Sequence, residues 1–434
     1  PTATYASDPL GDLVCPQKGK KDIYVQVDYM AGQKPDNTAL ANVANAFANS
    51  AVAGTPTNGI ALHIFVTNQI PWQMNTYYNT DPIGNPTFLA LKLSYFGTDA
   101  EKTCPAVLPA GISDCNTYTK DLLTAKRQIF HYAMFIHDQG EDKFSSGYAD
   151  RPGNDIVVSL GEFASHVGSV DQQAGTFMHE LGHNLGLFHG GNQDLNCKPN
   201  YPSVMQYALQ FDKSSGGFLS GRALDYSRAA YSSITENTLS ESTAAMTSSV
   251  RGLPARTTEV GGWTGTAAAT PFAQAMGTTV NWDQVTGPAT YSRNVHYFDM
   301  SGCRDTTLTT LTSFDDWHNL IFSFRGFSTF DSGAETNNAF DDASSSDTNP
   351  TGGTTTDPGA SGSINPSVIP PADPYITKGH SISTSATIVD PNNAATGWDV
   401  TINYGDSTTV GPTHTTSTTI PLSHTYNTAG NIPV

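Results

Sequence analysis

The fold of this chain is decided by MHELGHNLGLFHGG, residues Met178 to Gly191. Positions i and i+4 of an α-helix lie on one face, so His179 and His183 can present two imidazole nitrogens to one metal ion. Gly186 follows three residues later, and a glycine there can adopt a left-handed conformation that ends the helix and turns the chain. That turn would bring His189 back to the ion as a third ligand. Three histidines leave a fourth position open, as catalytic zinc sites do.

Glu180 follows the first of these histidines and is placed to face a metal-bound water instead of the metal itself. Zinc lowers the pKa of such a water towards neutrality, and a carboxylate can take its proton as it attacks a peptide carbonyl. The alternative is a set of ordinary histidines on an amphipathic helix, since a bare H-E-x-x-H also occurs by chance. Gly186 and His189 in register weaken that alternative. The motif therefore predicts one catalytic Zn²⁺ with Glu180 as the base.

These residues resemble the metzincin metallopeptidases, a clan marked by H-E-x-x-H-x-x-G-x-x-H and a downstream methionine turn. The second mark is present as YPSVMQY, Tyr201 to Tyr207. The resemblance implies that Met205 supports the metal site by packing and does not ligate. In the astacin and serralysin branches, a tyrosine two residues after this methionine contacts zinc or stabilises the oxyanion, and Tyr207 matches that position. A tyrosine packed behind the turn is an equal alternative.

The branch within the clan is not assigned. Asn184 and the HNLG run are similar to adamalysins, whereas the SVMQY turn is closer to serralysins and astacins. Gly190, which follows the third histidine, matches none of the best-known branches. The resemblance is sharpest over residues 175–207, and it implies a zincin-type catalytic domain over residues 1–328.

Strands alternate with helices on the N-terminal side of the motif, which predicts an α/β (α+β) domain with a twisted, mainly parallel mixed sheet and an active-site helix. We expect a later helix over Asp315–Phe324, where apolar residues have helical spacing, and we expect Asp155–Leu160 to be the edge strand of the sheet. The expected strands cover residues 20–30, 59–67, 129–136 and 155–160, and the expected helices follow Asp36 or cover residues 120–127 and 172–187.

A change of composition separates this domain from the C-terminal part. Residues 329–366 are mostly Ser, Thr, Gly, Asp, Asn, Ala and Pro, which predicts a flexible linker. Residues 367–434 return to short β-type runs and predict a small all-β sandwich. This part resembles the polycystic-kidney-disease (PKD) module through Trp398, the Tyr404-Gly405-Asp406 turn and His424-Thr425-Tyr426. Its expected final strand is missing before Val434, so we expect a truncated module.

Composition favours an exported protein. The 39 acidic and 21 basic residues give a net charge of -18, which argues against nucleic acid or an anionic membrane as a partner. No apolar run is long enough to span a bilayer. Pro1 is not followed by the basic and apolar regions of a signal peptide, so we expect that any signal peptide has been removed. Cys104 and Cys115 bracket a short, turn-rich loop typical of a local disulfide. Cys197 could pair with Cys303, which would leave Cys15 over.

We therefore expect a secreted zinc-dependent endopeptidase that acts on protein or peptide substrates along the edge strand of its sheet. The alternative is a non-catalytic adhesion or binding protein on a peptidase scaffold, but the presence of Glu180 favours the enzyme. Zinc-dependent hydrolysis of a non-peptide substrate is a third hypothesis. The PKD-like module is expected to bind protein or polysaccharide surfaces. Calcium is possible, but Asp315-Asp316 and Asp341-Asp342 lack the spacing of a calcium loop and are expected on a solvated surface.

Overall fold

The described residues form two compact units, one within residues 1–324 and the other within residues 360–434. The expected linker, Cys15 and the Asp341-Asp342 pair lie outside the described residues. The computed structural model describes Pro16 and residues 19–53, 58–78, 84–109, 111–140, 144–217, 221–240, 259–263, 271–275, 290–292, 294–296, 303, 305, 307–325, 367–369, 381–389, 398–403, 408–417 and 419–425.

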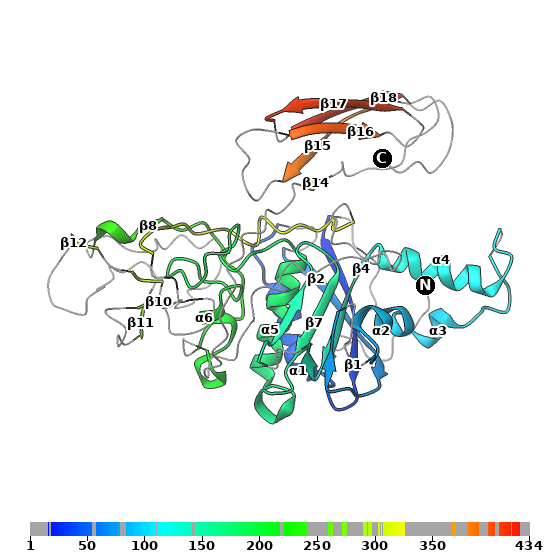
Figure 1. Cartoon of the computed structure of the whole chain (residues 1–434), viewed down its shortest axis with the longest axis horizontal. Helices are drawn as coiled ribbons and strands as arrows, with labels where there is room; N and C mark the ends of the chain where they lie inside the picture. Colours follow the sequence, from blue (N-terminus) through cyan, green and yellow to red (C-terminus); the bar gives the residue numbers. More distant parts are fainter. Residues whose placement is uncertain are drawn as a thin grey trace. The chain divides into compact units, whose positions relative to one another are not determined.

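A five-stranded mixed sheet forms the centre of the first unit (Figure 1), with the order β2-β1-β4-β7-β6. The first four strands run parallel, with Tyr24 of β1 opposite Phe130 of β4, and β6 pairs antiparallel with β7. The mainly parallel sheet predicted from the sequence is therefore present. Its strands are β1 (Lys21–Met30), β2 (Ile60–Ile70), β4 (Phe130–Ile136), β6 (Gly147–Ala149) and β7 (Asp155–Ser159).

Helices cover both faces of this sheet. On one face, α1 (Asn37–Ala48) and α5 (Val170–Asn184) pack on each other and on the strands through residues such as Phe47 and Leu181. On the other face, α2 (Phe88–Tyr95) and α4 (Cys115–Arg127) pack through Phe88 and Leu123. The short α3 (Asp99–Lys102) lies beside α4. Each layer buries one apolar face, which is the arrangement expected of alternating strands and helices.

Local signals fix where the two helices of the first face begin. Asp36 caps α1, because its side chain accepts a hydrogen bond from the Thr38 backbone N–H. Ser169 and Gln172 form a reciprocal capping box at the start of α5, which satisfies two backbone donors that the helix leaves unpaired. These caps fix the start of the helix that carries the histidine motif.

Two predictions about the secondary structure and sheet order of the first unit are wrong. The edge position is taken by β6, while the strand expected there, β7, lies between β4 and β6. Residues 315–324 form turns and irregular structure and not a helix. The physical reason is that their backbone N–H groups bond to distant segments: that of Asp316 donates to Ser227 O, and that of Ile321 donates to Leu185 O.

Short elements make up the rest of the first unit. β3 pairs parallel with β5, and the later strands form two-stranded antiparallel sheets, β10-β11, β12-β9 and β13-β8. Their bounds are β3 (Asn75–Thr76), β5 (Asp138–Gln139), α6 (Tyr207–Gln210), β8 (Ile234–Thr235), β9 (Leu239–Ser240), β10 (Glu259–Trp263), β11 (Pro271–Ala275), β12 (Thr290–Tyr291) and β13 (Thr310–Leu311), with 3-10 turns at Ala164–His166, Lys213–Ser215 and Glu236–Thr238.

The second unit holds two small antiparallel sheets, β14-β15-β18 and β16-β17. Ile420 and Leu422 of one sheet pack against Val400 and Ile402 of the other. The Tyr404-Gly405-Asp406 turn lies outside the described residues. The strands are β14 (Ser367–Ile369), β15 (Ser381–Val389), β16 (Trp398–Asn403), β17 (Thr409–Thr415) and β18 (Thr419–Thr425).

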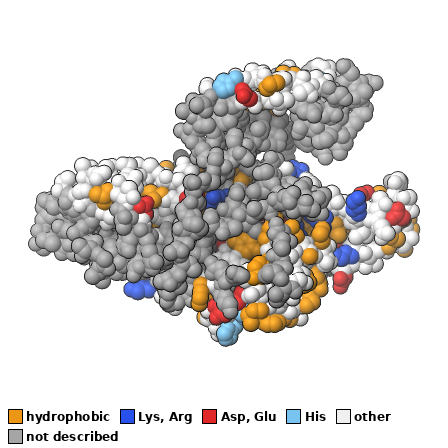
Figure 2. Space-filling model, in the orientation of Figure 1, with side chains coloured by type: hydrophobic (Ala, Val, Ile, Leu, Met, Phe, Trp, Pro, Cys, Tyr) orange, Lys and Arg blue, Asp and Glu red, His pale blue; other side chains and the backbone are white. Residues whose placement is uncertain are grey.

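Both disulfides considered from the sequence are formed, Cys104–Cys115 and Cys197–Cys303. Among the described residues, none of the helices is long and apolar enough to cross a membrane. In the described part of the face drawn in Figure 2, Lys and Arg side chains lie at scattered positions.

Candidate metal centre

Three histidines meet in the interior of the first unit. The nitrogen atoms that His179, His183 and His189 can offer to a metal lie within 4.8 Å of one another. The first two come from α5, in which every residue from Gln172 to Asn184 is buried. The third is brought back by the turn after the helix. A left-handed Gly186, with φ of +86°, makes that turn, in the conformation predicted from the sequence.

Backbone carbonyls fix how the two helical imidazoles carry their protons. His179 Nδ1 lies 2.8 Å from Val204 O, and His183 Nδ1 lies 2.7 Å from Leu187 O. A carbonyl oxygen can only accept a hydrogen bond, so Nδ1 is the protonated nitrogen in each neutral ring. The Nε2 lone pairs of His179 and His183 then face each other at 3.1 Å.

This geometry fits a bound cation. Two nitrogens held tetrahedrally by one zinc ion, each at about 2.05 Å, would lie about 3.3 Å apart. Burial, and then the neighbouring His179, hold the pKa values of His183 and His189 well below the ordinary value. The rings are therefore neutral, which is the form that ligates metals. Two buried lone pairs in close contact repel each other unless a cation lies between them.

Polar groups outside the centre surround His189. Asp194 Oδ1 lies 3.7 Å from His189 Nδ1 and 3.1 Å from Arg151 Nη1. The Arg151 guanidinium also lies 4.0 Å from the centre of the Phe188 ring. The Asp194 carboxylate thus lies on the Nδ1 side of the His189 ring. The other nitrogen, Nε2, is then the one available to a metal ion. Asp194 and Arg151 are not predicted by the sequence, because neither lies at a recognisable spacing from the motif.

The Glu180 carboxylate is fully buried and lies against the edge strand. A Cβ atom added to Gly147 of β6 would stand 2.8 Å from Glu180 Oε1 and 2.5 Å from Val157 O. Only a glycine allows β6, β7 and the carboxylate to approach this closely. Gly147 is therefore a site residue that the sequence did not reveal.

Met205 packs against Gly182 of α5, which lies between His179 and His183 in the sequence. A Cβ atom on Gly182 would overlap Met205 Sδ and would stand 3.0 Å from the Tyr226 hydroxyl. Tyr226 in turn donates a hydrogen bond of 2.6 Å to Met178 O. These contacts agree with a supporting role for Met205 by packing.

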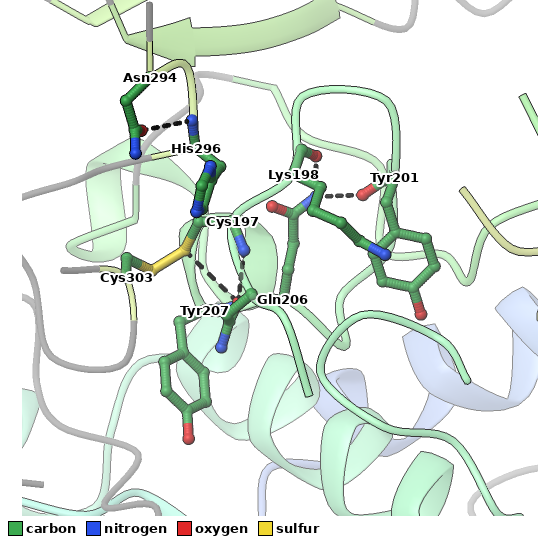
Figure 3. The surroundings of a disulfide bond; sticks show 9 residues. Cys197, Lys198, Tyr201, Gln206, Tyr207, Asn294, His296 and Cys303 are labelled. Atoms are coloured by element: carbon green, nitrogen blue, oxygen red, sulfur yellow. Dashed lines mark hydrogen bonds between the residues drawn. A yellow bond between two sulfur atoms is a disulfide. The ribbon is translucent and has the colours of Figure 1, made fainter. Parts of the chain in front are cut away.

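The ring of Tyr207 lies against two of the histidines. Its centroid is 4.6 Å from that of His189 and 5.9 Å from that of His179. Tyr207 also packs with the buried Cys197–Cys303 disulfide (Figure 3). Its backbone N–H donates to Asn196 Oδ1. Tyr207 is thus beside the histidines that could hold a metal ion, where either of the two roles considered from the sequence would place it.

Residues more than 100 positions after the motif pack in the same core as its helix. Asp316 is fully buried, and its carboxylate accepts hydrogen bonds from the Tyr201 hydroxyl and the Ser227 backbone N–H. Its predicted place on a solvated surface is wrong, because these donors hold the carboxyl group inside the protein, where burial raises its pKa to about 7. Trp317 packs on Phe47, with ring centroids 5.1 Å apart, and its indole N–H donates to Asp225 Oδ1.

Other histidines have structural environments. His63 is buried beside Asp22 at 2.9 Å, and His131 Nδ1 lies 2.9 Å from Asn184 Oδ1. Both agree with the core role expected from their apolar strands. Burial lowers the pKa of His131 to about 4, so this ring is neutral.

The chain matches no protein-family model and no curated protein. The structure itself contains a mixed α/β fold with two disulfides and a buried group of three histidines that could hold a metal ion. Among the described residues, no second group of three or more ligating side chains meets in this way.

Proposed function

We propose that this chain is a secreted zinc-dependent endopeptidase of the metzincin type. The observation that carries the proposal is the pair of Nε2 lone pairs on His179 and His183, facing each other in a buried centre that His189 completes. Three imidazoles and no thiolate suit zinc and leave an open coordination position. A zinc ion bound there would supply a Lewis acid that lowers the pKa of water and polarises a peptide carbonyl.

Glu180 is the proposed base. Its carboxylate is on the same helix as two ligands and is one residue after the first of them. The carboxylate takes the proton of the attacking water and passes it to the nitrogen of the departing amine, so that the peptide bond is replaced by a carboxylate and a free amine. Tyr207, packed against His189, is the second proposed catalytic residue, and its hydroxyl would donate to the oxyanion.

The peptide substrate would pair with β6, the edge strand, because Gly147 of this strand lies beside the Glu180 carboxylate. This replaces the position along Asp155–Leu160 that the sequence predicts. All three residues of β6 are buried. A peptide would therefore reach this strand only after the segments over it move aside.

The second unit is proposed to be a PKD-like module that binds protein or polysaccharide surfaces. Support comes from its two small antiparallel sheets and from the Trp398 and His424 positions of the resemblance. Secretion is supported by the two disulfides, which persist in oxidising compartments.

The decisive experiment compares casein cleavage by the wild type and by Glu180→Ala, with bound zinc quantified in both. We expect the wild type to cleave and the variant to lose cleavage while both retain one zinc ion per chain. His179→Ala is the matched control for the ligands, and it should lose zinc and cleavage together. Zinc retention without cleavage of any peptide in a broad library would refute the peptidase and favour the binding protein. Hydrolysis of esters or amides without casein cleavage would favour a non-peptide substrate.

A further inference from the structure

Lys198 is a buried cation close to the third ligand. Its side chain is 1% exposed, and its ammonium donates a hydrogen bond of 2.8 Å to Gly190 O. The ammonium also lies 5.1 Å from the centre of the Tyr201 ring (Figure 3). Burying an ammonium costs several kcal/mol unless partners compensate for the lost water. An apolar side chain would avoid this cost, so the lysine has a role that depends on its charge or its donors.

The carbonyl that Lys198 binds belongs to the residue directly after His189. A Cβ atom on Gly190 would stand 3.0 Å from Lys198 Nζ and 2.8 Å from Gln193 O, which explains a glycine at this position. The Gly190 backbone N–H donates to Gln193 O at 2.7 Å. Both polar groups of the Gly190 backbone are therefore held, and the loop 190–198 is closed upon itself by its last side chain.

The backbone of the same lysine joins this loop to the methionine turn. Lys198 O accepts a hydrogen bond from Gln206 Nε2, the residue between Met205 and Tyr207. Two residues before Lys198, Asn196 Oδ1 accepts the Tyr207 backbone N–H at 3.0 Å. A displacement of Lys198 would thus disturb both the residue after His189 and the methionine turn.

Asp316 is near enough to Lys198 to influence its ammonium through charge. Burial lowers the pKa of Lys198 to about 8, and Asp316 opposes this shift through its charge. The Tyr201 hydroxyl binds Asp316 at 2.8 Å, so the aromatic face beside the ammonium is itself fixed. The geometry holds the ammonium at one place, against one carbonyl.

We propose that Lys198 is a positioning residue for the third metal ligand, holding His189 in place through the Gly190 carbonyl. The proposal rests on the metal site of the proposed function. In this role Lys198 touches neither the substrate nor the metal. Loss of a group that orients a metal ligand without binding the metal typically weakens metal affinity about 10- to 100-fold.

A double-mutant cycle on the full chain tests this. Zinc dissociation constants are measured by competition with a chromophoric chelator for the wild type, Lys198→Met, His189→Ala and the double variant. We expect Lys198→Met to weaken zinc binding about 10-fold or more. In the His189→Ala background the same substitution should have less than about a twofold effect, since the residue it positions is gone. The single substitution Lys198→Met should also change the absorption bands of the Co²⁺-loaded protein. Lys213→Met, at an exposed lysine, is the control and should match the wild type.

Two results would overturn the proposal: wild-type zinc affinity and Co²⁺ bands in Lys198→Met, or the same loss of affinity in both backgrounds. Lys198→Gln keeps an N–H donor and should recover part of the affinity; it carries the same cycle if far-UV circular dichroism shows that Lys198→Met does not fold. A wild type that binds no zinc refutes the proposed function itself, and is thereby distinguished from a failure of Lys198.

Discussion

Replacing Gly147 with alanine tests the close approach between β6 and the Glu180 carboxylate. The added Cβ would stand 2.8 Å from Glu180 Oε1 and 2.5 Å from Val157 O, whereas comfortable contacts with carbon begin near about 3.5 Å. The carboxylate therefore has to move by roughly half an ångström or more, or β6 has to move away from β7. Overpacking of this kind lowers the free energy of unfolding by about 1–3 kcal/mol. Because a shift of about 1 Å at a catalytic group can cost about 100-fold, we expect kcat to fall about 10- to 100-fold.

The assay follows casein cleavage, zinc content and urea denaturation of Gly147→Ala in parallel. Gly32→Ala is the matched control. Gly32 is exposed and has φ of +86°, but nothing lies within 4 Å of an added Cβ. Alanine there should cost about 1–2 kcal/mol of backbone strain and leave kcat unchanged. Zinc should be retained by both variants. A Gly147→Ala protein with wild-type kcat would refute the placement of the carboxylate, and a Gly32→Ala protein with reduced kcat would show that stability alone limits turnover.

Four further predictions concern the metal site and the core residues of the first unit. Tyr207→Phe should lower kcat about 10-fold or more with zinc content unchanged, as expected for loss of an oxyanion donor; an unchanged kcat would leave the ring a packing role. A chelator should abolish cleavage and added Zn²⁺ should restore it, whereas full activity of metal-free protein would contradict the zinc mechanism. In the unfolded chain His131 takes up a proton below about pH 6.5, whereas in the fold its pKa is about 4. The free energy of unfolding therefore decreases as the pH is lowered from 7 to 5. Removing that ring with His131→Gln should reduce the loss between pH 7 and pH 5 by about 2 kcal/mol, read from urea midpoints, and an equal loss in both proteins would contradict it. Trp317→Ala should lower the free energy of unfolding by about 3–5 kcal/mol, and a change below about 1 kcal/mol would place the indole outside the core.

Most strands and helices of the first unit could be predicted from local sequence patterns. Alternating strands and helices predicted the parallel part of the sheet, because hydrophobic periodicity reports directly on which face is buried. The histidine spacing also predicted the group of three side chains, since one helix and one left-handed glycine at Gly186 are enough to bring them together.

Features that depend on distant partners were not predictable. Residues 315–324 have helical spacing of apolar side chains, but Leu185 O accepts the Ile321 backbone N–H, which a helix would use internally. The burial of Asp316 depends on donors from Tyr201 and Ser227, which no local pattern shows. The edge strand β6 has three residues, too few for an alternation to be seen.

The contacts of residues 314–324 with α5 have a consequence for synthesis of the protein on the ribosome. Ile321 binds the carbonyl at the end of α5 and packs on Gly186, and Trp317 packs beside α1. The nascent chain therefore carries its three histidines for more than 100 residues before the segment that fixes the end of their helix has emerged. Until then α5 lacks these contacts. A chain released before this segment is made would have the whole histidine motif without the residues that pack against the end of its helix.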